Sequence, residues 1–327
     1  MTKTIQCISP VDGRVYAERP ALTPDQAAAA VARARAAQPA WAARPPEERI
    51  ARVNAVVKNL NDDKPRVVEE LAWQMGRPTR FGGEFGGLNE RTAYMSGIAA
   101  EALAPMIAEE TDRFARRIEF APHGVVFVIA PWNYPYMTAM NTIVPALIAG
   151  NAVILKHASQ TLLVGERIAD AMAKAGVPSD VFQNIVLDHP GTEKLIADRS
   201  FGFVNFTGSV AGGQAIERAA AGTFTATGLE LGGKDPGYVM EDADLDWAVD
   251  VLMDGAMYNA GQCCCGIERI YVNHKLFDDF VEKSVKWVNT LKLGNPFDAD
   301  TTLGPMANKR FAATVREVVV AVLLSAE

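Results

Sequence analysis

Cysteine and histidine are scarce in this chain of 327 residues, which contains four of each. No two cysteines have the C-x-x-C spacing that is typical of zinc and iron–sulfur sites. The histidines are scattered along the sequence at His123, His157, His189 and His274. We therefore predict no metal centre. So few thiols suit a reducing cytosol, where cysteines stay free, and we expect no disulfide framework.

Excess positive charge and long apolar runs are missing as well. The net charge of −7 and the pI near 5.3 argue against binding to nucleic acid or to an anionic membrane. No uninterrupted apolar run approaches the ~18 residues of a membrane span, and the N-terminal segment lacks the apolar core of a signal peptide. We expect a cytoplasmic protein whose partner is a small molecule, with no nucleic acid and no membrane bound.

Apolar residues make up 49% of the chain, which is enough for a large core and for two or more domains. In the central third, short β-branched runs alternate with helical patterns. Strands are predicted at 125–129, 152–155, 182–186 and 203–206, with helices from about 136, at 162–175 and at 191–197. This rhythm predicts an α/β fold with a doubly wound, Rossmann-like parallel sheet.

The flanking regions also show clear patterns. On the N-terminal side we expect a surface hairpin at 5–19 and helices at about 24–43, after 46, at 64–75 and up to 103. An exposed strand is expected within 113–120. On the C-terminal side we expect helices at 245–258, 276–291 and 315–327 and a strand at 269–272. The last helix is apolar on every side from 318 to 324, a pattern that calls for burial.

Ligands of doubly wound sheets bind beyond the carboxyl ends of the strands, so the turns at those ends are candidate sites. They are residues 130–135, 156–159 and 207–209. Gly208 and Ser209 open a helix whose free N–H groups and dipole suit a pyrophosphate. Because the run is not the usual G-x-G-x-x-G, a plain tight turn is the alternative.

Residues 228–234 read GLELGGK and fit the G-x-x-x-x-G-K pattern of a phosphate-binding loop. Such a loop needs a serine or threonine next and a helix after it, whereas Asp235 and Pro236 follow here. We therefore exclude a nucleoside-triphosphate site. Glu230 stands in this apolar, glycine-rich run, either as a salt-bridged surface acid or as a buried base with a raised pKa.

Three of the four cysteines are adjacent, in the run Asn259-Ala260-Gly261-Gln262-Cys263-Cys264-Cys265. Buried, inert thiols are the ordinary interpretation of such residues. The glycine and amide lead-in, and the polar turns upstream, instead favour one thiol as a catalytic nucleophile.

Five short motifs occur in this order: APWNYP, GNAVILK, FTGS, ELGGK and NAGQCC. With these motifs the sequence resembles the NAD(P)-dependent aldehyde dehydrogenase superfamily over nearly its whole length. The resemblance implies oxidation of an aldehyde or semialdehyde to a carboxylic acid, with hydride transfer to NAD(P). By the family's G-Q-x-C pattern the nucleophile is Cys264, Asn133 helps to hold the oxyanion, and Glu230 activates the water that hydrolyses the thioester.

The resemblance also implies the cofactor contacts. Lys156 corresponds to the family lysine that hydrogen-bonds the adenosine ribose, and Gly208 and Ser209 correspond to positions at the pyrophosphate. Pro131 and Trp132 belong to the same cofactor-binding set. Ser159 stands where NAD-preferring members often carry a glutamate that repels a 2′-phosphate. We therefore predict that NADP is accepted as well as NAD.

Family members usually continue for well over a hundred residues past the point reached here, including an E-x-F-G-P motif and a last strand for subunit pairing. We expect a cofactor-binding domain at 1–103 and 123–232, a protruding oligomerisation hairpin at 104–122, and a truncated catalytic domain at 233–327. The resemblance implies a homodimer or homotetramer. The alternative function is a truncated, non-catalytic protein of the same family that binds nucleotide or a partner subunit.

Overall fold

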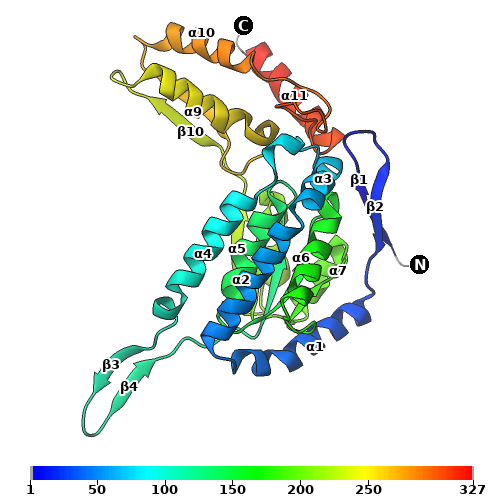
Figure 1. Cartoon of the computed structure of the whole chain (residues 1–327), viewed down its shortest axis with the longest axis vertical. Coiled ribbons are helices and arrows are strands. Elements are labelled where there is room, and N and C mark those ends of the chain that lie inside the picture. Colours follow the sequence, from blue (N-terminus) through cyan, green and yellow to red (C-terminus); the bar gives the residue numbers. More distant parts are fainter. Residues whose placement is uncertain (1–2, 326–327) are drawn as a thin grey trace. The chain divides into compact units, whose positions relative to one another are not determined.

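A computed structural model describes residues 3–325, which form two compact units (Figure 1). The first unit contains the chain up to Ile5 together with Glu18–Lys64 and Glu84–Glu230. The second contains Gln6–Ala17, Pro65–Gly83 and the chain from Leu231 onward. Each unit is built around its own sheet and is described separately.

The first unit holds a five-stranded sheet with the strand order β7-β6-β5-β8-β9. The strands are β5 (Val125–Ile129), β6 (Ala152–Lys156), β7 (Phe182–Asn184), β8 (Phe203–Gly208) and β9 (Ala226–Leu231). β5 pairs in parallel with β6 on one side and with β8 on the other, and β6 pairs in parallel with β7. All five residues of β5 are buried, as expected for a central strand covered on both faces.

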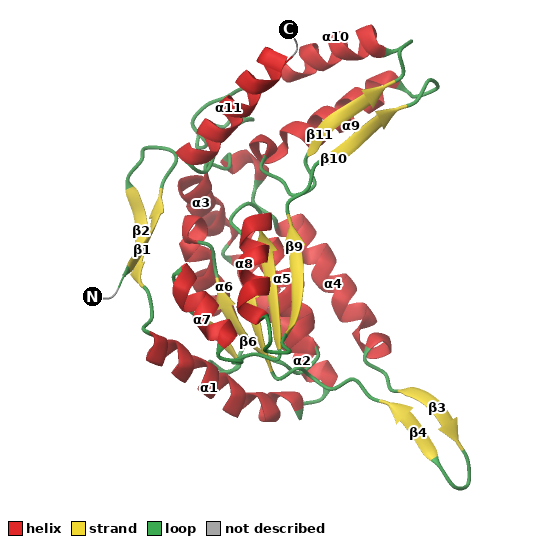
Figure 2. Cartoon of the chain, turned by 180° about the vertical axis from the view of Figure 1, so that it is seen from behind, coloured by secondary structure: helices red, strands yellow, loops and turns green. Residues whose placement is uncertain are grey.

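Helices cover both faces of this sheet, which confirms the doubly wound architecture (Figure 2). On one face α1 (Pro24–Ala42), α7 (His189–Ala197) and α8 (Val210–Ala220) share a core with Val125, Phe127 and Ile129 of β5. On the other face lie α5 (Pro135–Ile148) and α6 (Leu162–Lys174), with α2 (Pro46–Asp62) and α4 (Phe85–Ala102) packed against them. Alternate residues of β5 thus serve opposite cores.

Local sequence signals place the helix of residues 24–42. Thr23 accepts a hydrogen bond from the Gln26 N–H, the Gln26 side chain returns one to the Thr23 N–H, and Pro24 occupies the first helical position. At the other end the indole of Trp41 is 1% exposed and donates to the Leu147 carbonyl at 2.9 Å. This contact fastens α1 to α5 while satisfying the one polar atom of a buried indole.

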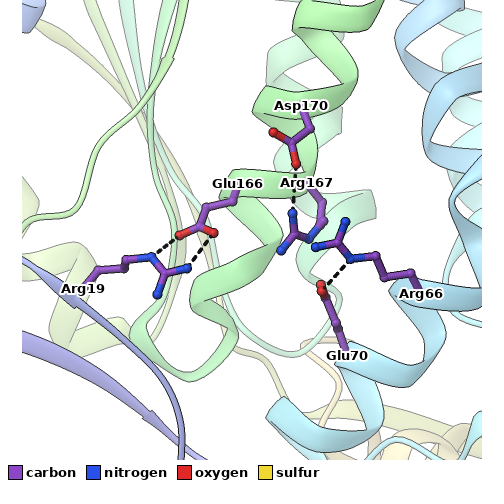
Figure 3. A network of polar contacts seen from close by, with 6 residues as sticks. All are labelled: Arg19, Arg66, Glu70, Glu166, Arg167 and Asp170. Atoms are coloured by element: carbon purple, nitrogen blue, oxygen red, sulfur yellow. Dashed lines mark hydrogen bonds and ion pairs between the residues drawn. The ribbon is translucent and has the colours of Figure 1, made fainter.

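One ion pair joins two separate segments of the chain, and two others lie within single helices (Figure 3). Arg19 forms a two-pronged pair with Glu166 of α6, with N–O distances of 2.7 and 2.9 Å. Arg167 pairs with Asp170 at 2.8 Å on the same helix. In the second unit Arg66 pairs with Glu70 at 3.0 Å. Each pair has at least one side chain that is more than a third exposed, which weakens its contribution to stability.

A hairpin of β3 (Met106–Glu110) and β4 (Ala115–Ile118) extends from the end of α4 within the first unit (Figure 1). Its exposed apolar side chains include Met106, Ile107, Phe114 and Ile118. The hairpin expected at 104–122 is therefore present. Its role in oligomerisation stays a prediction.

The second unit is built on two parallel strands, β10 (Asp235–Val239) and β11 (Ile267–Val272), covered by α9 (Leu245–Met257) and α10 (Phe277–Val288). The core contains Val239, Val249, Met253 and Phe280. The second unit also includes α3 (Lys64–Met75), α11 (Lys309–Ser325) and the short helix η1 (Thr79–Phe81). β1 (Thr4–Ile8) and β2 (Val15–Pro20) form the hairpin near the N-terminus. Val318, Val319 and Val320 of α11 are exposed, so the burial that the sequence led us to expect is not seen at these positions.

The division into units differs from the sequence-based boundaries at two segments. Residues 6–17 and 65–83 belong to the second unit, whereas the sequence analysis assigned them to the cofactor-binding domain. Contacts distant in sequence cause this: the Thr79 N–H donates to the Pro296 carbonyl at 2.9 Å, and Trp73 packs on Phe297 with ring centroids 4.6 Å apart. The functions assigned to the two parts stay a prediction.

Candidate functional site

In the first unit, the carboxyl ends of three neighbouring strands bring the predicted cofactor turns to one edge of the sheet. Ile129, the last residue of β5, is in register with Lys156 of β6 and with Phe206 of β8. The Ala130 N–H donates to the Lys156 carbonyl at 3.1 Å, which continues the pairing one residue past the strand. Pro131, Trp132 and Asn133 follow directly. The three turns therefore share the edge where such sheets bind nucleotides.

The turn that carries Asn133 ends at the first residue of α5. Pro131 is buried, and Trp132 and Asn133 are half-buried. The Asn133 amide oxygen accepts the Tyr134 N–H at 3.0 Å. Because that contact uses the oxygen, the Nδ2 group with its two N–H donors is the part of the side chain suited to hold an anion.

Two buried groups brace this turn. The His157 ring donates from Nε2 to the Pro135 carbonyl at 3.2 Å, and its Nδ1 contacts the Thr161 hydroxyl, also at 3.2 Å. Burial lowers the pKa of His157 to about 4, so the ring is neutral at physiological pH. The Glu84 carboxylate accepts the Met137 N–H at 2.8 Å, in the first turn of α5 where a negative charge is favourable.

Lys156 is the last residue of β6, and Ser159 follows it at the same edge of the sheet. Lys156 is half-buried; burial lowers the pKa of its ammonium group, and the negative charge of Asp188 opposes this shift. Ser159 is exposed at the start of the short helix η2 (Ser159–Thr161). A hydroxyl at this position brings no negative charge, so it does not repel a phosphate.

Gly208 and Ser209 form the junction between β8 and α8. Ser209 is the N-cap of the helix, and its hydroxyl accepts the Gly212 N–H at 3.2 Å. A Cβ added at Gly208 or at Gly212 would lie 2.6 or 2.5 Å from the Phe206 ring, so a larger residue at either place would require that ring to move. Exposed N–H groups and the positive end of the helix dipole make this junction suitable for a pyrophosphate. The residues present therefore fit a dinucleotide.

Glu230 is found in neither of its two expected settings. It lies in β9, the edge strand of the sheet, and its side chain is exposed. The expectation of a buried base is wrong for the residues described, because the Glu230 side chain is exposed. No ion pair to Glu230 occurs among the residues described, so the salt-bridged alternative is not seen either.

The loop that carries the cysteines belongs to the second unit and has an unusual backbone. In the short helix η3 (Tyr258–Gly261), Asn259, Ala260 and Gly261 have φ values of 53°, 58° and 71°. Left-handed residues other than glycine persist where surrounding contacts hold them. Here Gln262 donates to the Asn259 carbonyl at 2.9 Å and accepts the Ala307 N–H, also at 2.9 Å.

The thiols follow on a tight turn in which the Gly266 N–H donates to the Cys263 carbonyl at 3.3 Å. Cys264 and Cys265 are exposed and Cys263 is half-buried. The Cys263 and Cys265 sulfurs lie 3.2 Å apart. Hydrogen bonding with Cys263, burial and the neighbouring thiols raise the pKa of Cys265 to about 11, so it is a neutral thiol and a weak nucleophile at pH 7.

The glycine run before β10 reaches the same loop. β10 and β11 are parallel neighbours, so the segments that enter them lie at one end of the pair. A Cβ added at Gly233 would lie 3.0 Å from the Cys264 carbonyl oxygen. The structure therefore brings the end of the ELGGK run against the predicted nucleophile within the second unit.

The sequence analysis named Asn133, Lys156, Gly208 and Ser209, and the structure gathers them at one sheet edge. It did not identify the bracing residues. His157 could have been noticed because it follows the predicted ribose-binding lysine, whereas Glu84 has no sequence signal, since its partner lies 53 residues away. Among the described residues, no helix is long and apolar enough to cross a membrane.

Comparison with known proteins supports the resemblance to aldehyde dehydrogenases that the sequence motifs indicate. The profile of the aldehyde dehydrogenase family matches residues 1–323. The chain is 39% identical over 200 residues to a succinate-semialdehyde dehydrogenase (NADP(+)) of Mycobacterium leprae, an alignment that covers 61% of this chain and 44% of that protein. It is 35% identical over 314 residues to a 4,4'-diapolycopene aldehyde oxidase of Methylomonas, covering 94% of this chain and 58% of that protein. The chain thus spans about half the length of these two relatives.

Solved structures agree with these sequence matches. A putative aldehyde dehydrogenase from Burkholderia cenocepacia superposes with a TM-score of 0.92 at 31% identity, covering 97% of this chain and 65% of that one. A succinic semialdehyde dehydrogenase from Streptococcus pyogenes, solved with NADP+, has a TM-score of 0.90 at 30% identity, with 96% and 70% covered. The chain belongs to the aldehyde dehydrogenase family.

Proposed function

We propose that the protein oxidises an aldehyde or semialdehyde to a carboxylic acid with NAD(P) as hydride acceptor, through a covalent intermediate on Cys264. The observation that carries this proposal is the loop of residues 258–266. It presents Cys264 exposed at the end of a backbone held in left-handed conformation. The family membership and the dinucleotide-compatible sheet edge support it.

In the first step the Cys264 thiolate attacks the carbonyl carbon of the aldehyde, and the carbonyl oxygen becomes an oxyanion. The Asn133 Nδ2 group and the Cys264 backbone N–H are the proposed donors to that oxygen. Loss of one such donor typically slows turnover by roughly 10² to 10³. When NAD(P)+ is bound, it supplies the acceptor for the hydride, and an acyl thioester on Cys264 remains.

In the second step water hydrolyses the thioester and releases the carboxylic acid. We assign the general base to Glu230, which takes a proton from that water. Its exposed position in β9 makes the carboxylate accessible to solvent. Regeneration of the free Cys264 thiol completes the cycle.

The cofactor contacts follow from the sheet edge. We assign Lys156 and Ser159 to the adenosine ribose, Gly208 and Ser209 to the pyrophosphate, and Pro131 and Trp132 to the remainder of the dinucleotide. Ser159 carries no charge that would oppose a 2′-phosphate, and two relatives named above are described with NADP. We therefore propose that the protein accepts NADP as well as NAD. Several relatives are named as succinate-semialdehyde dehydrogenases, so a semialdehyde is the first substrate to test.

Two further aspects belong to the same proposal. The exposed apolar side chains of the β3–β4 hairpin support self-association into a homodimer or homotetramer. The cysteines form no disulfide among the described residues, which suits a cytoplasmic location.

The test is an aldehyde-dependent rise in the absorbance of reduced nicotinamide. We expect succinic semialdehyde with NADP to produce the rise, Cys264→Ala to abolish it and Cys263→Ala to retain it. Nucleotide binding without turnover in the unsubstituted chain would instead support a non-catalytic protein that binds nucleotide or a partner subunit.

A further inference from the structure

The three thiols of Cys263, Cys264 and Cys265 form a cluster that nucleophilic catalysis does not require. One thiol is enough to carry the acyl group, yet all three sulfur atoms lie within 4.8 Å of one another. The sequence argument against a metal site relied on the missing C-x-x-C spacing. That spacing is one way of making two sulfurs converge, and a tight turn is another.

The turn explains the convergence. Cys263 and Gly266 are its first and last residues, joined by the 3.3 Å hydrogen bond between the Gly266 N–H and the Cys263 carbonyl. The chain reverses over Cys264 and Cys265, so the first and third side chains meet and their sulfurs lie 3.2 Å apart. Gln262 and Asn259 hold the entry to the turn, and β11 begins directly after it. The thiols are therefore carried on braced backbone.

We propose that this turn is a binding site for a soft divalent cation of the zinc and cadmium type, held by the three sulfurs. Thiolates prefer such cations over hard ones. With metal–sulfur bonds of about 2.3 Å and tetrahedral angles, bound sulfurs stand roughly 3.8 Å apart, which lies between the closest sulfur pair and the outer limit of the cluster.

The surroundings suit an ion that enters from solvent. Cys264 and Cys265 are exposed, so water can complete the coordination as a fourth ligand. A coordinating thiol is deprotonated outright by the cation, so the cluster needs no nearby base. Three anionic sulfurs with a divalent ion leave a net charge of −1 at an exposed place, where water solvates it.

The consequence for activity rests on the proposed function. A sulfur bound to the cation cannot attack a carbonyl carbon, so a loaded cluster holds Cys264 in an inactive form. Loading is reversible, because a chelator that binds the cation more tightly restores the free thiol.

The experiment uses the full chain, reduced with a phosphine and titrated with Cd²⁺, and follows the ultraviolet sulfur-to-cadmium charge-transfer absorption. We expect one equivalent of Cd²⁺ to bind. Cys263→Ser, Cys264→Ser and Cys265→Ser should each remove about a third of the absorption and weaken binding at least about tenfold. Serine is close to cysteine in size and these positions are not deeply buried, so the variants should fold. Cys7→Ala, at the buried cysteine outside the turn, is the matched control and should bind as the unsubstituted chain does.

Absence of a charge-transfer band in the unsubstituted chain overturns the site, and so does full Cd²⁺ affinity in both Cys263→Ser and Cys265→Ser. Aldehyde-dependent turnover is measured in parallel and should fall along the same Cd²⁺ curve. Turnover that continues with the cluster saturated refutes the participation of Cys264. A chain that shows the band but no turnover without Cd²⁺ refutes the proposed function and leaves the metal site standing.

Discussion

His157 should make the stability of the first unit depend on pH. Its ring is buried between Pro135 and Thr161, and burial lowers its pKa from 6.5 to about 4. The unfolded chain binds a proton as the pH falls below about 6.5, whereas the folded chain resists protonation until about pH 4. The contribution of the neutral ring is therefore present in full above pH 6.5 and is lost as the pH falls toward 4.

The size of the effect follows from the two pKa values. The full difference corresponds to about 3 kcal/mol of unfolding free energy, and the part lost between about pH 7 and pH 5 is about 2 kcal/mol. His157→Gln removes the titrating ring but keeps an N–H donor for the Pro135 carbonyl. The neighbouring Lys156 and nearby carboxylates contribute their own pH dependence, which is common to both proteins and cancels in the comparison.

Urea unfolding followed by tryptophan fluorescence measures the difference. We expect the unsubstituted chain to lose about 2 kcal/mol more than His157→Gln between about pH 7 and pH 5. His274→Gln replaces an exposed histidine and is the matched control, with an unchanged pH profile. Parallel profiles for the unsubstituted chain and His157→Gln would refute the burial argument.

Four further substitutions, and one control at Gly97, test other parts of the account. Gly208→Ala places a methyl group 2.6 Å from the Phe206 ring, so it should lower the unfolding free energy by about 1–3 kcal/mol and weaken NADP binding in calorimetry. The control Gly97→Ala lies in open space on α4 and should raise the unfolding free energy by up to about 1 kcal/mol. Ser159→Glu introduces a charge that repels the 2′-phosphate and should shift the ratio of kcat/KM for NADP over NAD at least about tenfold toward NAD; an unchanged ratio argues against contact with the ribose. Phe127→Ala empties a fully buried site stacked on Phe201 and should lower the unfolding free energy by about 3–5 kcal/mol in urea titrations; a loss below about 1 kcal/mol contradicts the packing described. Glu230→Gln should slow thioester hydrolysis and leave a stoichiometric burst of reduced nicotinamide, and steady turnover at the unsubstituted rate excludes Glu230 as the base.

The central sheet could be predicted from sequence because its strands are buried on both faces. Residues 125–129 form a continuous apolar run, and β5 spans those residues in the structure. The helix predicted at about 24–43 is α1, which ends at Ala42. Its start is set by the capping box at Thr23.

Two edge strands, β9 and β10, were not predicted. β9 and β10 contain Gly228, Pro236 and Gly237, residues that weaken a strand pattern. Their pairing partners, β8 and β11, supply the stabilisation that the local sequence lacks. Such tertiary support cannot be seen in a single segment.

The candidate site likewise contains features that local sequence predicts and features that depend on tertiary packing. Turn residues after predicted strands were found because parallel strands align their carboxyl ends, a rule that needs no long-range information. The contact of Glu84 with the start of α5 and the convergence of the cysteine sulfurs depend on tertiary packing and on turn conformation. Spacing along the chain was therefore a poor guide to whether three sulfurs meet.

The most direct test of the central claim is to identify the cysteine that carries the acyl group. Glu230→Gln protein would be mixed with succinic semialdehyde and NADP, quenched in acid, digested and mapped by mass spectrometry. The account predicts one acyl group per chain, located on Cys264. An acyl group on Cys263 or Cys265, or an unmodified peptide despite bound nucleotide, would contradict it.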